Sequence, residues 1–292
     1  MTQYRKEVGF LVPVDYVRPT VKHAEAKEPF YQSMINVALG LIRFQGGEFI
    51  SEGNENVPLT GGAVLAGNHH GYLDFIYYGV PAFLQGRRLV RFMAKKAVFD
   101  SKISGPLMRG MKHIPVDREA GRDAYLHAVQ DLQAGRLVGV FPEATHSRSF
   151  ELKDFKSGAA RMAYEAGVPL IPMVNFGSQR VWTKGGPKHL GRKKYPLWVR
   201  VGEPIEATED AVATTEKLHK VMSEMYVQLK ADYIERFGPF PDGLPWMPAS
   251  LGGSAPTLAE ANKMDEEERV RRAAERAAKA ANKAANKDAD RK

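Results

Sequence analysis

Apolar and polar positions change their period several times along the chain. Between residues 57 and 206, short apolar runs of strand length alternate with segments whose apolar residues recur at helical spacing. The apolar runs are residues 63–67, 89–94, 113–116, 137–141, 170–175 and 197–202, and the helical segments are 73–83, 103–111, 120–134 and 155–166. This alternation predicts an α/β domain whose central sheet is mostly parallel and is flanked by helices.

The N-terminal segment has a different pattern. Residues 1–27 are polar and interrupted by prolines, which predicts an irregular arm. Residues 30–44 carry apolar side chains at helical spacing, and two interpretations stay open for this amphipathic helix: it packs in the core, or it lies in the headgroup layer of a membrane. It is too short to span a bilayer, which takes about 20 apolar residues.

The C-terminal third is predicted to contain a helix, a linker and a tail. Residues 207–237 have a long helical pattern that would pack on the sheet, and residues 239–256 are rich in Pro, Gly and Ser. Residues 257–292 are rich in Ala, Lys and Glu and cannot bury a core, so we expect a solvated helix or a disordered tail. A weak electrostatic contact between this tail and anionic lipid is the alternative. The expected divisions are an N-terminal arm and helix (1–56), an α/β domain (57–238), a linker (239–256) and a charged tail (257–292).

Composition narrows the classes of function. The 292 residues include no cysteine, which excludes disulfides, thiolate metal sites and cysteine nucleophiles. A net charge of +8 favours anionic partners such as phosphate ligands or anionic lipid headgroups. Nucleic acid is a weaker candidate, because no aromatic residues are interleaved with the basic tail for base stacking. The first residues lack the apolar core of a signal peptide, so we expect a protein that is soluble or lies on a membrane surface.

The stretch N-H-H-G-Y-L-D-F, residues 68–75, carries the first candidate chemistry. It follows an apolar strand and begins a helix, which is the usual position of a site in an α/β sheet. A histidine paired with a carboxylate can remove a proton from a hydroxyl. Alone, the stretch does not decide whether His69 or His70 pairs with Asp74, or whether Asp74 only caps the helix.

Two further strand ends carry charged side chains. The stretch G-V-F-P-E-A-T-H-S-R-S, residues 139–149, brings Glu143 and Arg148 to one turn, and Asp117 and Arg118 end the strand before it. Carboxylates orient hydroxyl groups and guanidinium groups bind phosphate oxygens, so these turns suit a polyol that bears a phosphate. The three strand ends together favour a site over three unrelated surface charges.

In order and spacing these blocks resemble the glycerolipid acyltransferase family, which includes bacterial 1-acylglycerol-3-phosphate acyltransferases. The family block N-H-x-S-x-x-D is matched by Asn68, His69 and Asp74, and an apolar strand that closes on Asp-Arg by residues 114–118. The block F-P-E-G-T-R-S is resembled by residues 141–147 and V-P-[LIV]-[IV]-P is matched by residues 168–172, so the resemblance covers roughly residues 60–205. Three positions depart from it: Gly71 where the family often has Ser, Ala144 in place of Gly, and His146 where Arg is common.

The resemblance implies acyl transfer from a thioester to an alcohol, with His69 as general base and Asp74 as its partner. The substrate-binding residues that it implies are Arg118, Glu143, Thr145, Arg148 and Lys156. The implied donor is acyl-CoA or acyl carrier protein, the acceptor is the free hydroxyl of 1-acyl-glycerol 3-phosphate, and no metal or other cofactor is needed. Glycerol 3-phosphate or another lysophospholipid is the alternative acceptor, and a non-enzymatic protein that binds anionic lipid is the alternative of another class. A different acyltransferase class would use His70 with Asp74, but its downstream block D-F-G-W-G is absent from the sequence.

Amphiphilic substrates imply work at a membrane. We therefore expect a peripheral enzyme of phospholipid biosynthesis at the cytoplasmic face of the cell membrane. The helix at residues 30–44 is one expected contact with the anionic lipid surface. The other is the basic segment 180–195, with Trp182 and Tyr195 as interfacial aromatic residues, for which an ordinary solvated hairpin is the alternative.

Overall fold

A computed structural model describes residues 2–117 and 121–289 of the chain. They form two compact units. The first unit comprises Met1–His146 and Leu152–Phe240, and the second comprises Ser147–Glu151 and Pro241–Lys292. The N-terminal arm, the first helix and the α/β region thus share one unit, and the domain boundaries near residues 57 and 257 stay predictions.

The first unit is built on a nine-stranded sheet in the order β1-β2-β3-β9-β8-β4-β7-β5-β6. The pairs β1–β2 and β8–β9 are antiparallel and the other neighbouring strands are parallel, which confirms the mostly parallel α/β fold. The carboxyl ends of β4, β7 and β5 therefore meet at one edge of the sheet. The strands are β1 Tyr4–Glu7, β2 Phe10–Pro13, β3 Phe49–Glu52, β4 Ala63–Gly67, β5 Val90–Lys95, β6 Ile114–Val116, β7 Leu137–Val140, β8 Leu170–Phe176 and β9 Leu197–Val201.

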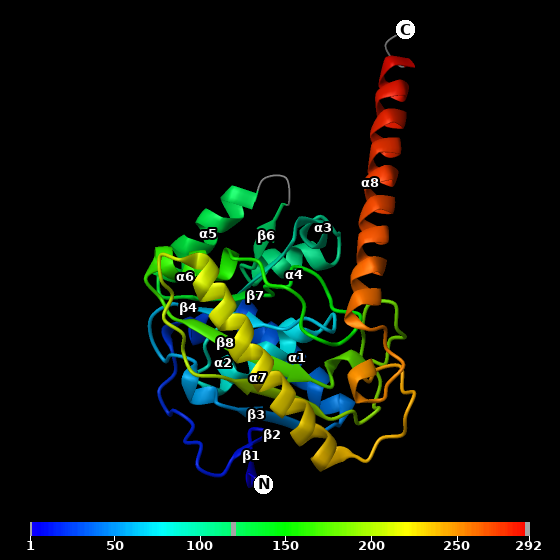
Figure 1. The fold of residues 1–292 in the computed structure, drawn as a ribbon. Helices are drawn as coiled ribbons and strands as arrows, with labels where there is room; N and C mark the ends of the chain where they lie inside the picture. Colours follow the sequence, from blue (N-terminus) through cyan, green and yellow to red (C-terminus); the bar gives the residue numbers. More distant parts are fainter. Residues whose placement is uncertain (1, 118–120, 290–292) are drawn as a thin grey trace. The chain divides into compact units, whose positions relative to one another are not determined.

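Helices cover both faces of this sheet (Figure 1). Helices α5, α6 and α7 lie on one face, where α7 crosses β8, while α1 and α2 pack on the other. Buried residues of α1 and α2, among them Leu39, Ile42, Tyr77 and Tyr78, share a core with the inner side chains of the sheet. The helices are α1 Pro29–Gln45, α2 Asp74–Leu84, α3 Lys96–Phe99, α4 Ser104–Gly110, α5 Gly121–Gln133, α6 Gly158–Ala166, α7 Ala211–Phe237 and, in the second unit, α8 Leu258–Ala289.

The prediction of an irregular N-terminal arm is wrong for residues 4–13. These residues form the hairpin β1–β2, and β2 joins the main sheet through β3. Phe10 and Val12 alternate with half-buried neighbours, which is the period of a strand with one buried face. Four residues are too few for that period to stand out, and the partner strand β3 lies far along the chain.

Helix α1 packs in the core on one face, and its contact with a membrane stays a prediction. Tyr31, Leu39 and Ile42 are buried against the sheet domain, whereas Phe30, Val37 and Phe44 are 42%, 65% and 59% exposed. The exposed residues are seven positions apart, so they form one stripe along the helix. In the described part of the chain, no helix combines the length and the apolar content that crossing a membrane would require.

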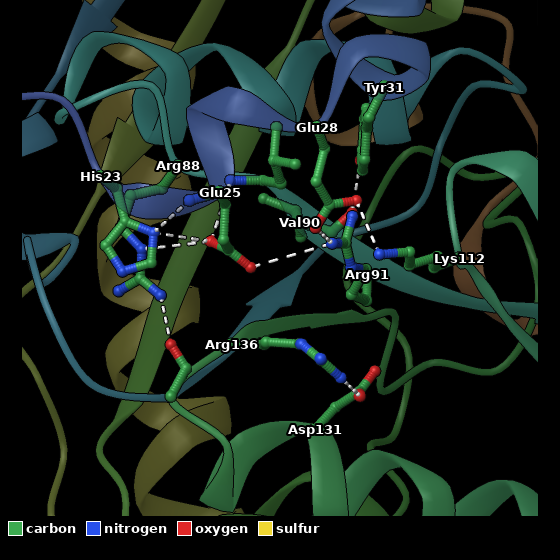
Figure 2. A network of polar contacts seen from close by, with 12 residues as sticks. His23, Glu25, Glu28, Tyr31, Arg88, Val90, Arg91, Lys112, Asp131 and Arg136 are labelled. Atoms are coloured by element: carbon green, nitrogen blue, oxygen red, sulfur yellow. Dashed lines mark hydrogen bonds and ion pairs between the residues drawn. The ribbon is translucent and has the colours of Figure 1, made fainter.

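A buried polar network ties the segment before α1 to the sheet (Figure 2). Arg88 and Arg91 are almost fully buried, and both face Glu25, at 3.7 Å and 3.9 Å. Arg91 also pairs with Glu28, which in turn binds Lys112 at 3.1 Å. Arg88 donates further hydrogen bonds to three backbone carbonyl oxygens, those of Pro58, Gly61 and Gly135. Buried charges are tolerated when they are paired in this way.

Candidate active site

The candidate site lies at the carboxyl ends of two neighbouring parallel strands. After β4, residues 68–73 form a loop, which we call the catalytic loop, and α2 begins at Asp74. After β7, the chain turns through residues 141–146. Because β4 and β7 are paired in the sheet, the two loops face each other.

His69 and Asp74 form the expected pair. His69 Nδ1 lies 3.0 Å from Asp74 Oδ2, and the same oxygen accepts the backbone N–H groups of His70 at 2.7 Å and Gly71 at 2.8 Å. Burial alone would raise the pKa of Asp74, but the hydrogen bond and charge of His69, helped by the Gly71 N–H, lower it overall. With Nδ1 committed to an ionised carboxylate, His69 keeps Nε2 for a substrate proton.

His70 turns into the protein. Its side chain is fully buried, and its ring contacts the amide of Asn68 at 3.1 Å and the hydroxyl of Tyr226 at 3.4 Å. Burial lowers the pKa of His70 to about 3, so the ring is neutral at ordinary pH. Its side chain does not replace His69 at the carboxylate, which decides between the two spacings that the sequence leaves open.

A buried hydrogen-bonded network, which the sequence motifs do not predict, supports the catalytic loop. Asn68 Oδ1 accepts the Tyr78 hydroxyl at 2.5 Å and the Asn175 N–H at 2.7 Å, and Asn175 Nδ2 donates to the Tyr78 hydroxyl at 2.9 Å. The network joins β4, α2 and β8, and all three residues are buried. One sequence signal is available: Tyr78 lies one helical turn after Asp74, on the face of α2 that meets the loop.

The segment after β8 holds the catalytic loop from the side. Tyr72 donates its N–H to the Trp182 carbonyl at 3.0 Å, and the Thr183 hydroxyl donates to the His70 carbonyl at 2.5 Å. A Cβ atom on Gly71 would lie 3.2 Å from the Trp182 oxygen and 3.1 Å from the Ser178 oxygen. A side chain at this position would therefore require the neighbouring backbone to shift by a few tenths of an ångström. Part of the segment 180–195, expected at the membrane, therefore positions the loop.

Glu143 lies directly behind His69. It is buried, and its two carboxylate oxygens accept the N–H of His69 at 2.8 Å and the N–H of Lys153 at 3.2 Å. Burial raises the pKa of Glu143 to about 8 even though both N–H groups act to lower it. Glu143 thus fixes the backbone of His69, and its expected contact with substrate hydroxyls stays a prediction.

The residue after Glu143 has an unusual backbone. Ala144 has a φ of 58°, in the left-handed region that favours glycine. The family glycine at this place matches the turn, and the alanine here adopts the same conformation at a cost of about 1 kcal/mol. The backbone turn at position 144 is therefore retained although alanine replaces the family glycine.

The ring of His69 is covered on both faces. Phe141 stacks on one face with centroids 3.9 Å apart, and His146 stacks on the other at 3.7 Å. Tyr72 lies against His146 at 4.4 Å, and Trp182 lies against Tyr72 at 4.7 Å. The side chain of His69 stays 16% exposed, so the edge of the ring is still accessible.

The other predicted substrate-binding residues differ in burial and in their contacts. Thr145 is half-buried in the turn after β7, and Lys156 is exposed, with its N–H bonded to the Pro142 carbonyl. Arg148 belongs to the second unit, where it pairs with Asp265 at 3.2 Å and Glu268 at 2.8 Å on α8. Arg118 lies outside the described residues.

Two lysines near the site are absent from the sequence prediction. The positive charges of Lys95 and Lys184 act on His146 and help to lower its pKa, after the larger effects of burial and of His69. Lys95 ends β5, which is paired with β7, and Lys184 follows the residue that binds the His70 carbonyl. The sequence carries a signal for Lys95, because it stands at the end of an apolar strand like the other site residues.

The arrangement can activate a hydroxyl. His69 Nε2 can accept its proton, and Asp74 can stabilise the resulting imidazolium. Within the residues that the structure describes, no group of three or more His, Asp or Glu side chains is arranged to hold a metal ion.

Comparison with known proteins gives one consistent family. The family model described as Acyltransferase matches residues 48–175. A 1-acyl-sn-glycerol-3-phosphate acyltransferase of Bacillus subtilis is 28% identical over 207 residues, which cover 67% of this chain and 96% of that protein. A chloroplast 1-acyl-sn-glycerol-3-phosphate acyltransferase of Arabidopsis thaliana is 29% identical over 60% of this chain and 48% of its own length.

A solved structure shows the same fold. The crystal structure of the 1-acyl-sn-glycerophosphate acyltransferase from Thermotoga maritima superposes with a TM-score of 0.54 at 20% sequence identity. The match covers 71% of this chain and 92% of that chain.

Proposed function

The chain belongs to the glycerolipid acyltransferase family, and from that premise we propose that it moves a fatty acyl group from acyl-CoA or acyl carrier protein to the free hydroxyl of 1-acyl-glycerol 3-phosphate. The product would be phosphatidate, an intermediate of phospholipid biosynthesis. The observation that carries the proposal is the 3.0 Å contact between His69 Nδ1 and Asp74 Oδ2 at the mouth of the sheet. The named activity of the Bacillus and Arabidopsis relatives supports this choice of acceptor.

In the proposed reaction, His69 Nε2 removes the proton from the acceptor hydroxyl as its oxygen attacks the thioester carbon. Asp74 holds the imidazole in the required tautomer and stabilises the imidazolium. The tetrahedral intermediate then collapses, the C–S bond breaks, and the imidazolium returns the proton to the leaving thiolate. The products are an ester and a free thiol, so atoms and charge balance. We propose that no metal ion or other cofactor takes part.

One assay tests this function. Purified protein is offered radiolabelled acyl-CoA, or acyl carrier protein loaded with the same chain, with a panel of acceptors in the presence of EDTA. The panel contains lysophosphatidate, glycerol 3-phosphate and other lysophospholipids. We expect phosphatidate from lysophosphatidate; a product from glycerol 3-phosphate alone would change the acceptor, and no product from any pair would refute acyl transfer.

We propose that Lys95 and Lys184 bind the acceptor phosphate. Both lie near enough to His146 for their positive charges to help lower its pKa. Lysine is a common phosphate ligand, acting as a compact positive charge. The neighbouring ring of His146 is neutral, because burial lowers its pKa to about 3, so these two lysines supply positive charge at that place.

The phosphate contact predicts a specific kinetic change. We expect Lys95→Ala and Lys184→Ala each to raise KM for lysophosphatidate about tenfold, the loss of a charge-assisted hydrogen bond of about 1.5 kcal/mol. Turnover of monoacylglycerol, which lacks the phosphate, should change little. Lys193→Ala is the matched control, because Lys193 is an exposed lysine of the same segment as Lys184. If Arg148→Ala or Lys156→Ala raises KM instead, the phosphate lies elsewhere.

We propose that the enzyme works at the cytoplasmic face of the membrane as a peripheral protein. Its substrates are amphiphiles, and the exposed stripe of Phe30, Val37 and Phe44 on α1 offers apolar side chains to the headgroup layer. The net charge of +8 favours anionic lipid.

Membrane contact through α1 predicts how the protein is released. We expect high-salt or alkaline washing to strip most of it from membranes, and Val37→Asp with Phe44→Asp to lower binding to anionic vesicles at least tenfold, because each apolar side chain contributes about 1.5–3 kcal/mol when fully buried. Val227→Asp on α7 is the control, since Val227 is 65% exposed, as Val37 is. Release by detergent alone would indicate deeper insertion.

A further inference from the structure

We propose that His146 is a positioning residue for the general base, and that its ring clamps the outer face of His69 so that Nε2 stays directed at the acceptor hydroxyl. This inference rests on the proposed acyl transfer. It assigns a role to a residue that departs from the family pattern and that the reaction scheme above does not use.

A single hydrogen bond cannot fix the orientation of an imidazole. The contact between His69 Nδ1 and Asp74 Oδ2 holds one edge of the ring, but rotation about that contact would still swing Nε2 away. The terminal torsion of histidine is broad, so the side chain itself does not prevent this rotation. A misplacement of about 1 Å can lower a rate about a hundredfold.

Stacking on both faces supplies the missing restraint. The ring of His69 makes angles of 13° with Phe141 and 29° with His146, at centroid distances of 3.9 Å and 3.7 Å. Two rings stacked on His69 at these distances cannot share one face of it, so Phe141 and His146 lie on opposite faces. Rotation of His69 out of this plane would collide with one ring or the other.

His146 is itself held by its neighbours. Tyr72 from the catalytic loop packs against its ring at 4.4 Å, and Trp182 packs behind Tyr72 at 4.7 Å. Nε2 of His146 is buried and has no hydrogen-bond partner among the described residues. The Nε2 side of the His146 ring is therefore restrained by contacts with neighbouring rings.

In this chain, where His146 stacks on His69, a neutral ring suits this place better than a cation. His69 becomes positively charged as it accepts the proton, and a fixed charge stacked on it would oppose that step. Burial, and then the charge of His69, lower the pKa of His146 to about 3, so it stays neutral while the enzyme works. The charged or titratable groups beside the two rings are Asp74, Glu143, Tyr72, Lys95 and Lys184.

Three substitutions of His146 distinguish its role in positioning His69 from the effects of side-chain size and of charge at position 146. We expect His146→Ala to lower kcat about tenfold with little change in KM for either substrate, because the base loses one of its two ring contacts. His146→Phe, which keeps the stacking, should recover kcat to within about threefold of the wild type. His146→Arg should lower kcat and shift the acid limb of the pH profile of kcat/KM to lower pH, because a fixed positive charge opposes protonation of His69. The Phe variant should leave that limb in place.

The controls make each outcome decisive. His127→Ala removes an exposed histidine of α5 and should match the wild type in every measurement. Wild-type rates in the Ala variant, or a loss in Ala that Phe does not recover, would overturn the proposal. If the Ala variant does not fold, identical pH profiles for Arg and Phe would overturn it. An inactive wild type would instead refute the proposed acyl transfer.

Discussion

Replacing His69 with alanine is expected to lower kcat at least a hundredfold, because general-base catalysis contributes about 10²–10⁴ to a rate. The substitution removes the proton acceptor but leaves Asp74 with two backbone N–H donors, so the fold of the loop should survive. Steady-state kinetics with acyl-CoA and lysophosphatidate measure the loss. A thermal melting curve checks that the variant is folded.

His70→Ala provides the contrast for this experiment. His70 is buried and neutral and contacts Asn68 and Tyr226, so its removal should lower thermal stability and still leave measurable turnover. If His70→Ala loses activity completely and His69→Ala does not, the assignment of the base is wrong. A non-enzymatic lipid-binding protein would be indifferent to His69→Ala, and would lose its function on deletion of residues 257–292.

Glu143→Ala is expected to lower kcat about a hundredfold, although Glu143 takes no part in proton transfer. The change removes the acceptor of the His69 backbone N–H, which then lies buried without a partner at a cost of about 1–3 kcal/mol. The catalytic loop would shift, and small displacements of a base are costly. Steady-state kinetics measure the loss, and a normal rate in this variant would show that the loop needs no such support.

Glu143→Gln is the matched control, and it also tests the protonation state. Because the pKa of Glu143 is raised to about 8 in the fold, the neutral carboxyl binds its proton more tightly there than in the unfolded chain. Its contribution to stability is therefore full below about pH 4.5 and is lost as pH rises through about 8. Glutamine does not titrate, and its one amide oxygen can still accept the His69 N–H although its NH2 cannot accept the Lys153 N–H, so Glu143→Gln should keep activity within about tenfold near pH 7. Its melting temperature should fall less between pH 5 and 9 than that of the wild type, and equal slopes would contradict the raised pKa.

Local patterns predicted most of the fold. The strand at Ala63–Gly67 has the expected bounds, and most other elements from residue 63 onward begin and end within a few residues of the expected positions. The reason is that buried parallel strands and amphipathic helices carry their signals in consecutive residues. The hairpin β1–β2 was not predictable in this way, because its short strands depend on β3 for burial.

The pairing of His69 with Asp74 was predictable because both residues lie in one short loop. The supporting groups were not, since Asn175 and Trp182 come from more than 100 residues away and reach the loop through the sheet topology. Arg148 also depends on residues far along the chain. Its expected role in substrate binding stays a prediction, and in the second unit it pairs with two carboxylates of α8.

The buried network around Arg88 and Arg91 has a practical consequence for preparing the protein. Glu25 and Glu28 supply the carboxylates for two guanidinium groups inside the first unit, so a shortened chain that starts at α1 would leave those charges without counter-ions. An unpaired buried charge costs about 3–5 kcal/mol, a large share of the stability of an ordinary domain. The minimal expression unit therefore includes Glu25 and Glu28.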